Sequence, residues 1–255
     1  MQEVYTEFKN TPAEFKMIYV EGGVFEMGSN DETTLQDEKS VVTCKVKPFW
    51  VGEFLVTQSL WKFITDEPHK ETAYSFTGKH FPVESVSLED IETNFLPKLN
   101  GMIKDKYPKN MKYRLPTEVE WEFVARGGKY SNKYPFKYSG SDKLEEVGWF
   151  GWFDENIYGK RTQGELKDVA LKTPNLLGVY DMSGSVWEWC QNNIIGNITS
   201  NHTTIGSCKE PDSTEYSAYR GGSWLSSHLE CTPFSRMKAK ANSMNYMLGF
   251  RLAFS

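Results

Sequence analysis

RLPTEVEWEFVARGG, residues 114–128, contains the clearest local signal in the chain. Thr117 and Glu120 have the T-x-x-E spacing of a capping box, in which the hydroxyl and the carboxylate each bind a free backbone amide at the start of a helix. Gly127 suits the left-handed turn that ends a helix. The apolar positions between them fall on one face at helical spacing: Val119, Phe123 and Val124. The stretch therefore predicts a helix that begins after Thr117 and ends before Gly127.

Two stretches nearer the amino terminus have the pattern of β-strands. Residues 17–28 alternate apolar and polar side chains around Gly22 and Gly23, which predicts a hairpin. Residues 41–56 predict a second strand pair, interrupted at Pro48 and Gly52.

Two further helices are expected before residue 114. Thr57 precedes QSLWKFI, whose apolar residues fall at helical spacing. Another helix begins near Ser87, with Asp90 three residues on, and its apolar face is Ile91, Phe95 and Leu99. Pro97 lies inside this run, so we expect a kink or an early stop there.

The second half of the chain has a different character. Residues 129–255 are rich in Gly, Ser, Tyr, Trp and Asn and have few periodic stretches, so we expect loops and short strands. Aromatic residues make up 15% of the 255-residue chain, enough to fill the core of such a loop-rich fold. No internal repeat or linker is apparent, and one domain of the α+β class is the simplest account.

Charge and composition exclude several classes of protein. The net charge is −5, and no basic stripe is present that would neutralise phosphates, so nucleic acid is not an expected partner. No apolar run reaches the roughly 18 residues of a membrane helix. The first five residues show no signal-peptide pattern, so membrane anchoring requires a segment outside this sequence. The cysteines and histidines have no metal-ligand spacing: Cys44, Cys190, Cys208 and Cys231; His69, His80, His202 and His228.

Several segments together resemble the sulfatase-modifying, formylglycine-generating enzyme family. In chain order they are MIYVEGGVFEMGS, PFWVGEFLVTQSLWKFI, FPVESVSLED, YRLPTEVEWEFVARGG, PNLLGVYDMSGSVWEWC, YRGGSW and GFRLAFS. The resemblance implies a variant of the C-type lectin fold, loop-rich with few regular elements. It covers residues 17–255 as one domain and leaves residues 1–16 as an amino-terminal extension.

The resemblance also supplies a test for catalysis. Enzymes of this family oxidise a substrate cysteine with oxygen and a copper ion that two thiolates hold, five positions apart after the GGS-aromatic motif. That motif is residues 221–224 here, the second cysteine matches Cys231, and the first matches Ser226. A hydroxyl is a poor ligand for soft copper, so we expect no copper and no formylglycine-type catalysis.

A calcium site is the second implication of the resemblance. Four positions match those that bind calcium in the enzyme, two through carboxylates and two through carbonyls: Asp181, Gly184, Val186 and Glu188. All-oxygen ligation suits this cation. The alternative is a structural hydrogen-bonding role for the two acids. A second calcium site is doubtful, because Asn156 matches but its aspartate partner aligns with Ala170.

Residues 219–255 combine a family frame with an irregular filling. RGGSW, Cys231, Arg236 and GFRL keep the family spacing, whereas LSSHLE, TPFS and MKAKANSMNYML between them have no period. This resembles the variable proteins of diversity-generating retroelements, in which randomised adenines of AAC codons diversify a ligand-binding surface. The expected contacts are Leu225, Ser226, Ser227, His228, Leu229, Ser235, Ala239, Ser243, Asn245 and Tyr246. AAC codons do not explain Glu230, Met237, Lys238, Lys240, Met244 or Met247.

The sequence therefore predicts a non-catalytic receptor that displays a diversified surface to a protein or glycan ligand. By family analogy it is expected at a bacterial cell surface or in the periplasm. Two alternatives stay open: an oxidative enzyme with an altered metal site, and a structural or accessory lipoprotein module with its partner surface around residues 134–153.

Overall fold

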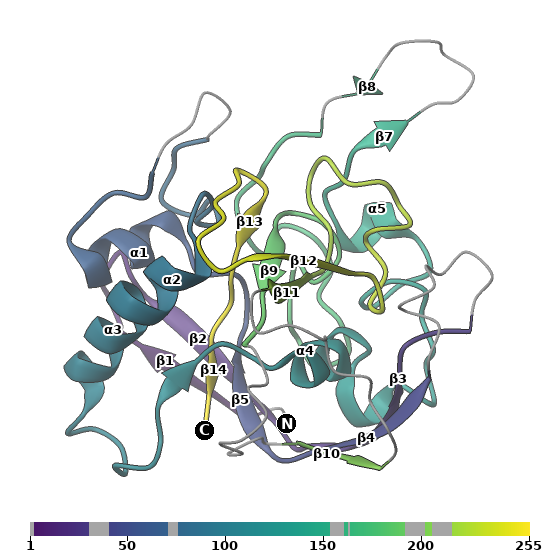
Figure 1. Cartoon of the computed structure of the whole chain (residues 1–255), viewed down its shortest axis with the longest axis horizontal. Coiled ribbons are helices and arrows are strands. Elements are labelled where there is room, and N and C mark those ends of the chain that lie inside the picture. The colour runs from purple at the N-terminus through teal and green to yellow at the C-terminus, as the bar shows by residue number, and fades with distance from the viewer. Residues whose placement is uncertain are drawn as a thin grey trace.

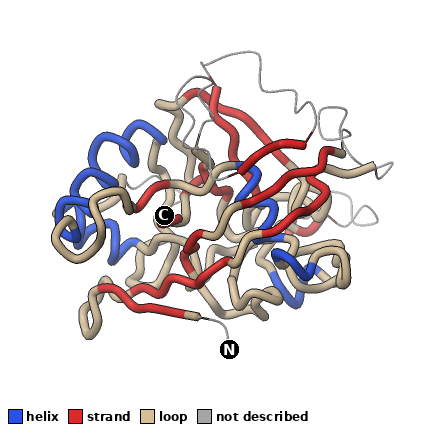
Figure 2. Tube along the Cα trace, turned by 90° about the horizontal axis from the view of Figure 1, so that it is seen from below, coloured by secondary structure: helices blue, strands red, loops and turns tan. Residues whose placement is uncertain are grey.

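The computed structural model describes residues 3–30, 41–70, 76–153, 161–162, 164–191, 202–205 and 216–255. Within these ranges the chain has a mixed helix and sheet fold with short elements joined by long loops, as the sequence predicted (Figure 1). Strands and loops make up most of the trace in Figure 2. None of the helices in the described ranges is long and apolar enough to cross a membrane.

The largest sheet has five antiparallel strands in the order β1-β2-β5-β14-β6. Its strands are β1 (Val4–Glu7), β2 (Phe15–Val20), β5 (Phe49–Gly52), β14 (Ala253–Phe254) and β6 (Tyr113–Arg114). Ala253 pairs with Val51 on one side and with Arg114 on the other, so the carboxyl end of the chain is inserted within the sheet. Its edge strand β1 lies within residues 1–16, which were expected as an extension.

Both predicted strand pairs were wrong in their pairing. Strand β3 (Gly23–Met27) pairs with β4 (Val42–Val46) in a second sheet of order β10-β4-β3, completed by β10 (His202–Ile205). Strand β2, which precedes Gly22, and strand β5, which follows Pro48, pair with each other in the first sheet. Gly22 has a φ of 80°, and a Cβ there would lie 2.6 Å from the carbonyl oxygen of Val46. The two glycines therefore form a corner between sheets rather than a hairpin turn.

The predicted helices near Thr57 and Ser87 are confirmed. Helix α1 (Gln58–Thr65) begins at Thr57, whose hydroxyl accepts from the amide of Leu60. Ser87 forms a capping box with Asp90 ahead of α2 (Leu88–Asp90). The chain continues through a π-helical turn, η1 (Ile91–Phe95), into α3 (Leu96–Ile103). Since Pro97 has no amide hydrogen to donate, the interruption of the α-helical pattern just before it has a local cause.

Helix α4 (Glu118–Ala125) has the predicted Thr117–Glu120 capping box and ends before Gly127, after which come η2 (Gly128–Tyr130) and α5 (Leu144–Val147). Every side chain of α4 from Val119 to Ala125 is buried, including the carboxylates of Glu120 and Glu122. The sequence indicated one apolar face, but the helix is covered on all sides. Its acids therefore need partners inside the protein.

The carboxyl-terminal part forms a third sheet in the order β12-β11-β9-β13. Its strands are β9 (Trp187–Trp189), β11 (Tyr216–Arg220), β12 (Arg236–Lys240) and β13 (Leu248–Gly249), the last parallel to β9. Figure 1 shows this region in the middle of the molecule, with α1–α3 on one side and α5 on the other. A two-stranded ribbon, β7 (Trp152–Phe153) and β8 (Arg161–Thr162), projects beside α5.

A buried ion pair connects these parts. The guanidinium of Arg251 donates from Nε to Glu188 Oε2 at 2.6 Å and from Nη2 to Glu188 Oε1 at 2.7 Å. It also donates to the carbonyl oxygens of Gly52, at 3.2 Å, and Tyr180, at 3.0 Å. Trp121 of α4 donates its indole hydrogen to Glu188 at 2.8 Å. Five segments therefore meet at two charged side chains.

Replacing Arg251 with methionine leaves the Glu188 carboxylate buried without its counter-charge. We expect Arg251→Met to lower the free energy of unfolding by about 3–5 kcal/mol, measured by urea denaturation. The matched control is Lys143→Met, which removes a cation from the exposed Lys143–Glu146 pair, with an expected change within about 0.5 kcal/mol. Similar losses in both variants would contradict this role of the pair.

Candidate functional site

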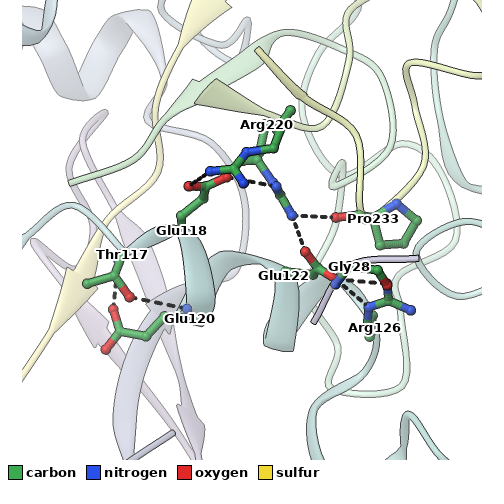
Figure 3. Close-up of polar contacts among 9 residues, drawn as sticks. Gly28, Thr117, Glu118, Glu120, Glu122, Arg126, Arg220 and Pro233 are labelled. Carbon is green, nitrogen blue, oxygen red and sulfur yellow. Dashed lines mark hydrogen bonds and ion pairs between the residues drawn. The ribbon is translucent and has the colours of Figure 1, made fainter. Parts of the chain in front are cut away.

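The carboxyl-terminal segment is fixed to α4 by buried charges (Figure 3). Arg220, at the end of β11, donates to Glu118 Oε1 at 2.8 Å, to the carboxylate of Glu122, and to the carbonyl oxygen of Pro233 at 2.9 Å. Arg236 on β12 donates to the other oxygen of Glu118 at 2.5 Å. Burial alone would raise the pKa of Glu122, but the charges of Arg126 and Arg220 hold that pKa below its usual range. The acids of α4 thus form the base of the predicted binding region.

The glycines after Arg220 allow the chain to turn against the buried Cys231. Gly222 has a φ of 77°, and a Cβ there would lie 2.6 Å from the sulfur of Cys231. Cys231 is fully buried among Tyr138, Leu144 and Val147. Burial raises the pKa of its thiol far above the ordinary value. A protonated, inaccessible thiol is a poor nucleophile and a poor metal ligand.

Ser226, the position that matches the enzyme's first cysteine, is also buried. Its hydroxyl lies 3.1 Å from the hydroxyl of Ser223. Its backbone is held as well, because its amide binds the carbonyl oxygen of Ser223 and its carbonyl oxygen accepts from Gly151. Ser226 therefore belongs to the frame, and its prediction as a ligand contact is corrected by its burial.

Residues 227–230 form a tight turn at the surface. Glu230 Oε2 accepts from the amide of Ser227 at 2.8 Å and from its hydroxyl at 3.0 Å. The turn leaves His228 exposed, and Leu229 is 43% exposed. The backbone is thus fixed by one carboxylate while two side chains point outward.

The second irregular stretch, residues 241–247, packs against the segment that leads into α2. The amide of Ser85 binds the carbonyl oxygen of Asn245 at 3.1 Å, and the amide of Glu89 binds that of Ala241 at 3.1 Å. Asn245 is exposed, whereas Ser243 and Ala239 are half-buried. The ring centroid of Tyr246, the residue after Asn245, lies 6.1 Å from that of Trp224. Tyr246 and Leu225 pack against the same apolar cluster.

The ten expected contacts come from two stretches of the chain, and Leu225 of the first packs against the same apolar cluster as Tyr246 of the second. Ser227, Leu229 and Ser235 line one groove, and Ala239, Ser243 and Asn245 lie along or near the other loop. Ser235 is 5% exposed, so only a few of its atoms are accessible. Met237, Lys238, Lys240 and Met244, which AAC codons do not explain, are among the most exposed side chains of the segment.

The groove has a volume of about 570 Å³ and two walls. One wall comes from residues 227–235 of the predicted variable segment. The other comes from Arg126, Phe136 and Lys137. Phe136 and Lys137 belong to the stretch 134–153 that was expected as a partner surface only for an accessory module, and Arg126 was not among the expected contacts. Those residues lie roughly a hundred positions earlier in the chain, so no local pattern could pair them with Leu229. A groove of this size falls within the range of small-ligand sites.

Comparison with known families decides what kind of domain carries this groove. Residues 2–255 match the model of the sulfatase-modifying factor enzyme 1-like domain. The chain belongs to this family. The predicted resemblance and the predicted fold are thereby confirmed.

Relatives within the family differ in what they are named for. The chain is 30% identical over 218 residues to the chaperone protein LppX of Paenibacillus barcinonensis, covering 71% of this chain and 72% of that one. It is 25% identical over 280 residues to the inactive C-alpha-formylglycine-generating enzyme 2 of Mus musculus, covering 94% of this chain and 85% of that one. The structure of Treponema denticola variable protein 1 superimposes with a TM-score of 0.72 at 25% identity, covering 98% of each chain. The family thus includes members named as inactive and a variable protein.

The residues matching the family's calcium ligands do not fit a calcium ion at Glu188. Both oxygens of that carboxylate are bound by Arg251 and Trp121, and a guanidinium is electrostatically opposed to a cation there. Asp181 accepts from the amide of Ala170 at 2.7 Å through Oδ2, and Oδ1 is buried without a hydrogen-bond partner. The amide of Gly184 binds the carbonyl oxygen of Gly221, and Val186 is fully buried. The alternative, a structural role for the acids, agrees with this geometry at Glu188. Asn156, which matched a ligand of the second calcium site, lies outside the described residues.

Asp181 should make stability depend on pH. Its burial raises the pKa of the carboxyl to about 6, so the folded state favours the protonated form. Stability is then lost as pH rises from about 4, the pKa of an unfolded aspartate, to about 6. We expect Asp181→Asn to stabilise the protein by on the order of 2 kcal/mol at pH 7.5, with no gain below about pH 4. Thermal unfolding across this range measures the effect, with the exposed Asp105→Asn as control; a variant destabilised at pH 7.5 contradicts it.

Calcium gives a separate prediction. Because Glu188 is already paired, we expect the melting temperature at pH 7.5 to be the same in excess calcium and in EDTA. Differential scanning calorimetry measures this directly. A calcium-dependent increase that Asp181→Asn abolishes would establish Asp181 as a ligand and overturn the prediction.

Proposed function

We propose that the protein is a non-catalytic binding protein whose ligand contacts the carboxyl-terminal surface, chiefly through the groove between residues 227–235 and 126–137. The observation that carries the proposal is the contrast between frame and surface. Arg220, Arg236 and Glu230 fix the backbone through buried or local bonds, while Leu229 and His228 stay exposed on it. Exposed side chains on such a frame can change at little cost in stability.

The state of the two positions that match the enzyme's cysteines supports this reading over catalysis. Ser226 provides a hydroxyl that is already bound to Ser223, and the thiol of Cys231 is buried and protonated. Copper held by a pair of soft thiolates is not compatible with these groups. The likeness to Treponema denticola variable protein 1 supports a diversified surface, and the inactive relative supports a family member without catalysis.

A second candidate is an accessory module that assists another protein. The relative named as a chaperone, 30% identical over 71% of this chain, favours it. Both candidates use a binding surface, but an accessory module needs a fixed one. Placement at a bacterial cell surface or in the periplasm, through an anchor outside this sequence, is part of the first proposal.

Sequencing codons 219–255 of this gene in many clones of its source distinguishes the two. If the surface is diversified, substitutions will concentrate at exposed positions, with His228, Leu229 and Asn245 varying more than the buried Ser226 and Ser235. Arg220, Cys231 and Arg251 will not change. An unvarying segment, or changes spread equally over buried and exposed positions, would count against diversification.

Catalysis is tested in parallel with a cysteine-containing peptide, oxygen and either copper or iron. We expect no aldehyde product by mass spectrometry, because no thiolate pair is available. Product formation that Cys231→Ala abolishes would replace the binding proposal with the enzymatic one.

A further inference from the structure

The second irregular stretch, residues 241–247, is held at its base by the segment that leads into α2. The amide of Ser85 binds the carbonyl oxygen of Asn245, and the amide of Glu89 binds that of Ala241, both at 3.1 Å. Figure 1 shows this stretch, which leads into β13, beside α2. The position of the loop therefore depends on the position of that segment.

A third segment, residues 66–70 after α1, contacts both of these. The ammonium group of Lys70 lies 3.5 Å from the carboxylate of Asp90 and 3.4 Å from the sulfur of Met244. Lys70 is exposed, and an exposed ion pair of this kind contributes little to stability. The buried contact of the segment lies one residue earlier, at His69.

His69 and Glu84 form a buried pair. His69 Nε2 lies 3.5 Å from Glu84 Oε1, and the two residues are 6% and 0% exposed. Among the residues that the structure describes, neither oxygen of Glu84 has a hydrogen-bond partner, and His69 is its one ion-pair partner. The histidine is therefore the counter-charge that the described residues supply to this carboxylate.

The other four buried glutamates in the described ranges have a different kind of partner. They pair with lysine or arginine: Glu7 with Lys106, Glu120 with Arg114, Glu122 with Arg126 and Arg220, and Glu188 with Arg251. Lysine and arginine stay charged throughout the neutral pH range, whereas histidine loses its charge there. Of these five acids, Glu84 is the one whose counter-charge depends on pH near neutrality.

The residue after Glu84 connects the pair to the surface loop. Ser85 has a φ of 56°, a left-handed conformation that residues with a Cβ keep when their surroundings fix it. Its hydroxyl is buried and has no hydrogen-bond partner in the described part of the chain. Its amide is the donor to Asn245. A displacement of Glu84 therefore reaches the bond that holds the loop within one residue.

The charge of the imidazole decides whether Glu84 is compensated. An ordinary imidazole is half protonated near pH 6.5, and in its charged form it neutralises the carboxylate. A neutral imidazole can still donate one hydrogen bond, but a net negative charge is then left in the interior, at a high cost in free energy. Exposing Glu84 to water relieves that cost and requires its segment to move. Since the folded state favours protonated His69, the stabilisation is present below about pH 6.5 and is lost above it.

We propose that the His69–Glu84 pair makes the placement of residues 241–247 depend on pH, with the loop held at mildly acidic pH and released as pH rises above about 6.5. This inference goes beyond the proposed function and does not require it, because the placement of the loop is a property of the chain alone. A ligand that contacts Asn245 would meet an ordered loop in acid and a loosened one in alkali.

The other ionisable groups on the surrounding elements differ from the pair in exposure or in titration range. Burial alone would raise the pKa of Asp90, but hydrogen bonds from Ser87 and the charge of Lys70 lower it; burial raises the pKa of Glu92. Residues 241–247 contribute Tyr246, and an ordinary tyrosine titrates near pH 10. All the remaining groups are exposed: Lys62, Asp66, Glu67, Lys79, His80, Glu89 and Lys98. His80 titrates in the same range as His69 and therefore supplies the matched control.

The test is amide hydrogen exchange of the full chain, followed by NMR at pH 5.5 and pH 8.0. Rates are expressed as protection factors, which remove the intrinsic pH dependence of exchange. We expect the protection factors of the Ser85 and Glu89 amides to fall by about tenfold between the two pH values. The amide of Trp121, bound within α4 to the carbonyl oxygen of Thr117, reports on the rest of the fold and should change less.

Two substitutions at the pair have opposite expected effects. Glu84→Gln removes the buried charge, so the Ser85 amide should stay protected at both pH values. His69→Gln leaves Glu84 without a counter-charge, so protection should be low at both. In His80→Gln, which removes the exposed histidine of the same segment, the tenfold change should persist. Circular dichroism verifies that the variants are folded, and Glu84→Gln decides the test if His69→Gln is not.

Two results would overturn the inference. Equal protection of the Ser85 amide at pH 5.5 and pH 8.0 in the unsubstituted chain would show that the pair keeps its proton or does not control the loop. A loss at pH 8.0 that persists in Glu84→Gln would assign the pH dependence to another group. Neither result bears on whether the surface binds a ligand.

Discussion

The Arg251–Glu188 pair is the constraint on which the rest of the structure depends. A charge removed from water needs an opposite charge and a full set of hydrogen bonds, and the two side chains meet that need only if five segments of the chain converge on them. Glu188 lies on β9, Gly52 ends β5, Tyr180 precedes the loop of Asp181, and Trp121 reaches Glu188 from α4. The pair therefore fixes how the five-stranded sheet, α4 and the carboxyl-terminal sheet lie relative to one another, which short strands and long loops alone would specify weakly.

Helix α4 connects the Arg251–Glu188 pair to the carboxyl-terminal surface segment. Its acids point to different parts of the fold: Glu120 pairs with Arg114 near the first sheet, and Glu122 pairs with Arg126 and Arg220. Through Arg220 the helix also holds the carbonyl oxygen of Pro233, inside the irregular segment. The surface loops are thus anchored at their bases by buried charges, while their tips contribute little to the core. This separation explains how one frame can serve relatives named for different activities, since the fold does not depend on the exposed tips.

The proposed binding groove does not require the enzyme's pair of cysteines. In this chain the positions that match the enzyme's cysteines are enclosed, with Ser226 bonded to Ser223 and Cys231 packed beneath Gly222. Accessible side chains of the groove are instead Leu229, Phe136 and the charged Lys137, Asp142 and Glu230. Recognition there needs no reactive group, only complementary shape and charge.

The sequence by itself determined the family, the α+β class and the local helix starts, because capping boxes at Thr117 and Ser87 depend on residues three apart. It also determined that Ser226 stands where a soft metal ligand would be needed. Strand pairing was beyond it: residues 17–28 and 41–56 alternate like hairpins, yet Gly22 and Pro48 separate strands of different sheets, a choice made by contacts far apart in the chain. Only the tertiary structure decided that Glu188 binds Arg251, that Ser226 and Ser235 are buried, and that Lys137 faces the same groove as Leu229. Burial and charge pairing depend on three-dimensional neighbours, and residue spacing does not encode them.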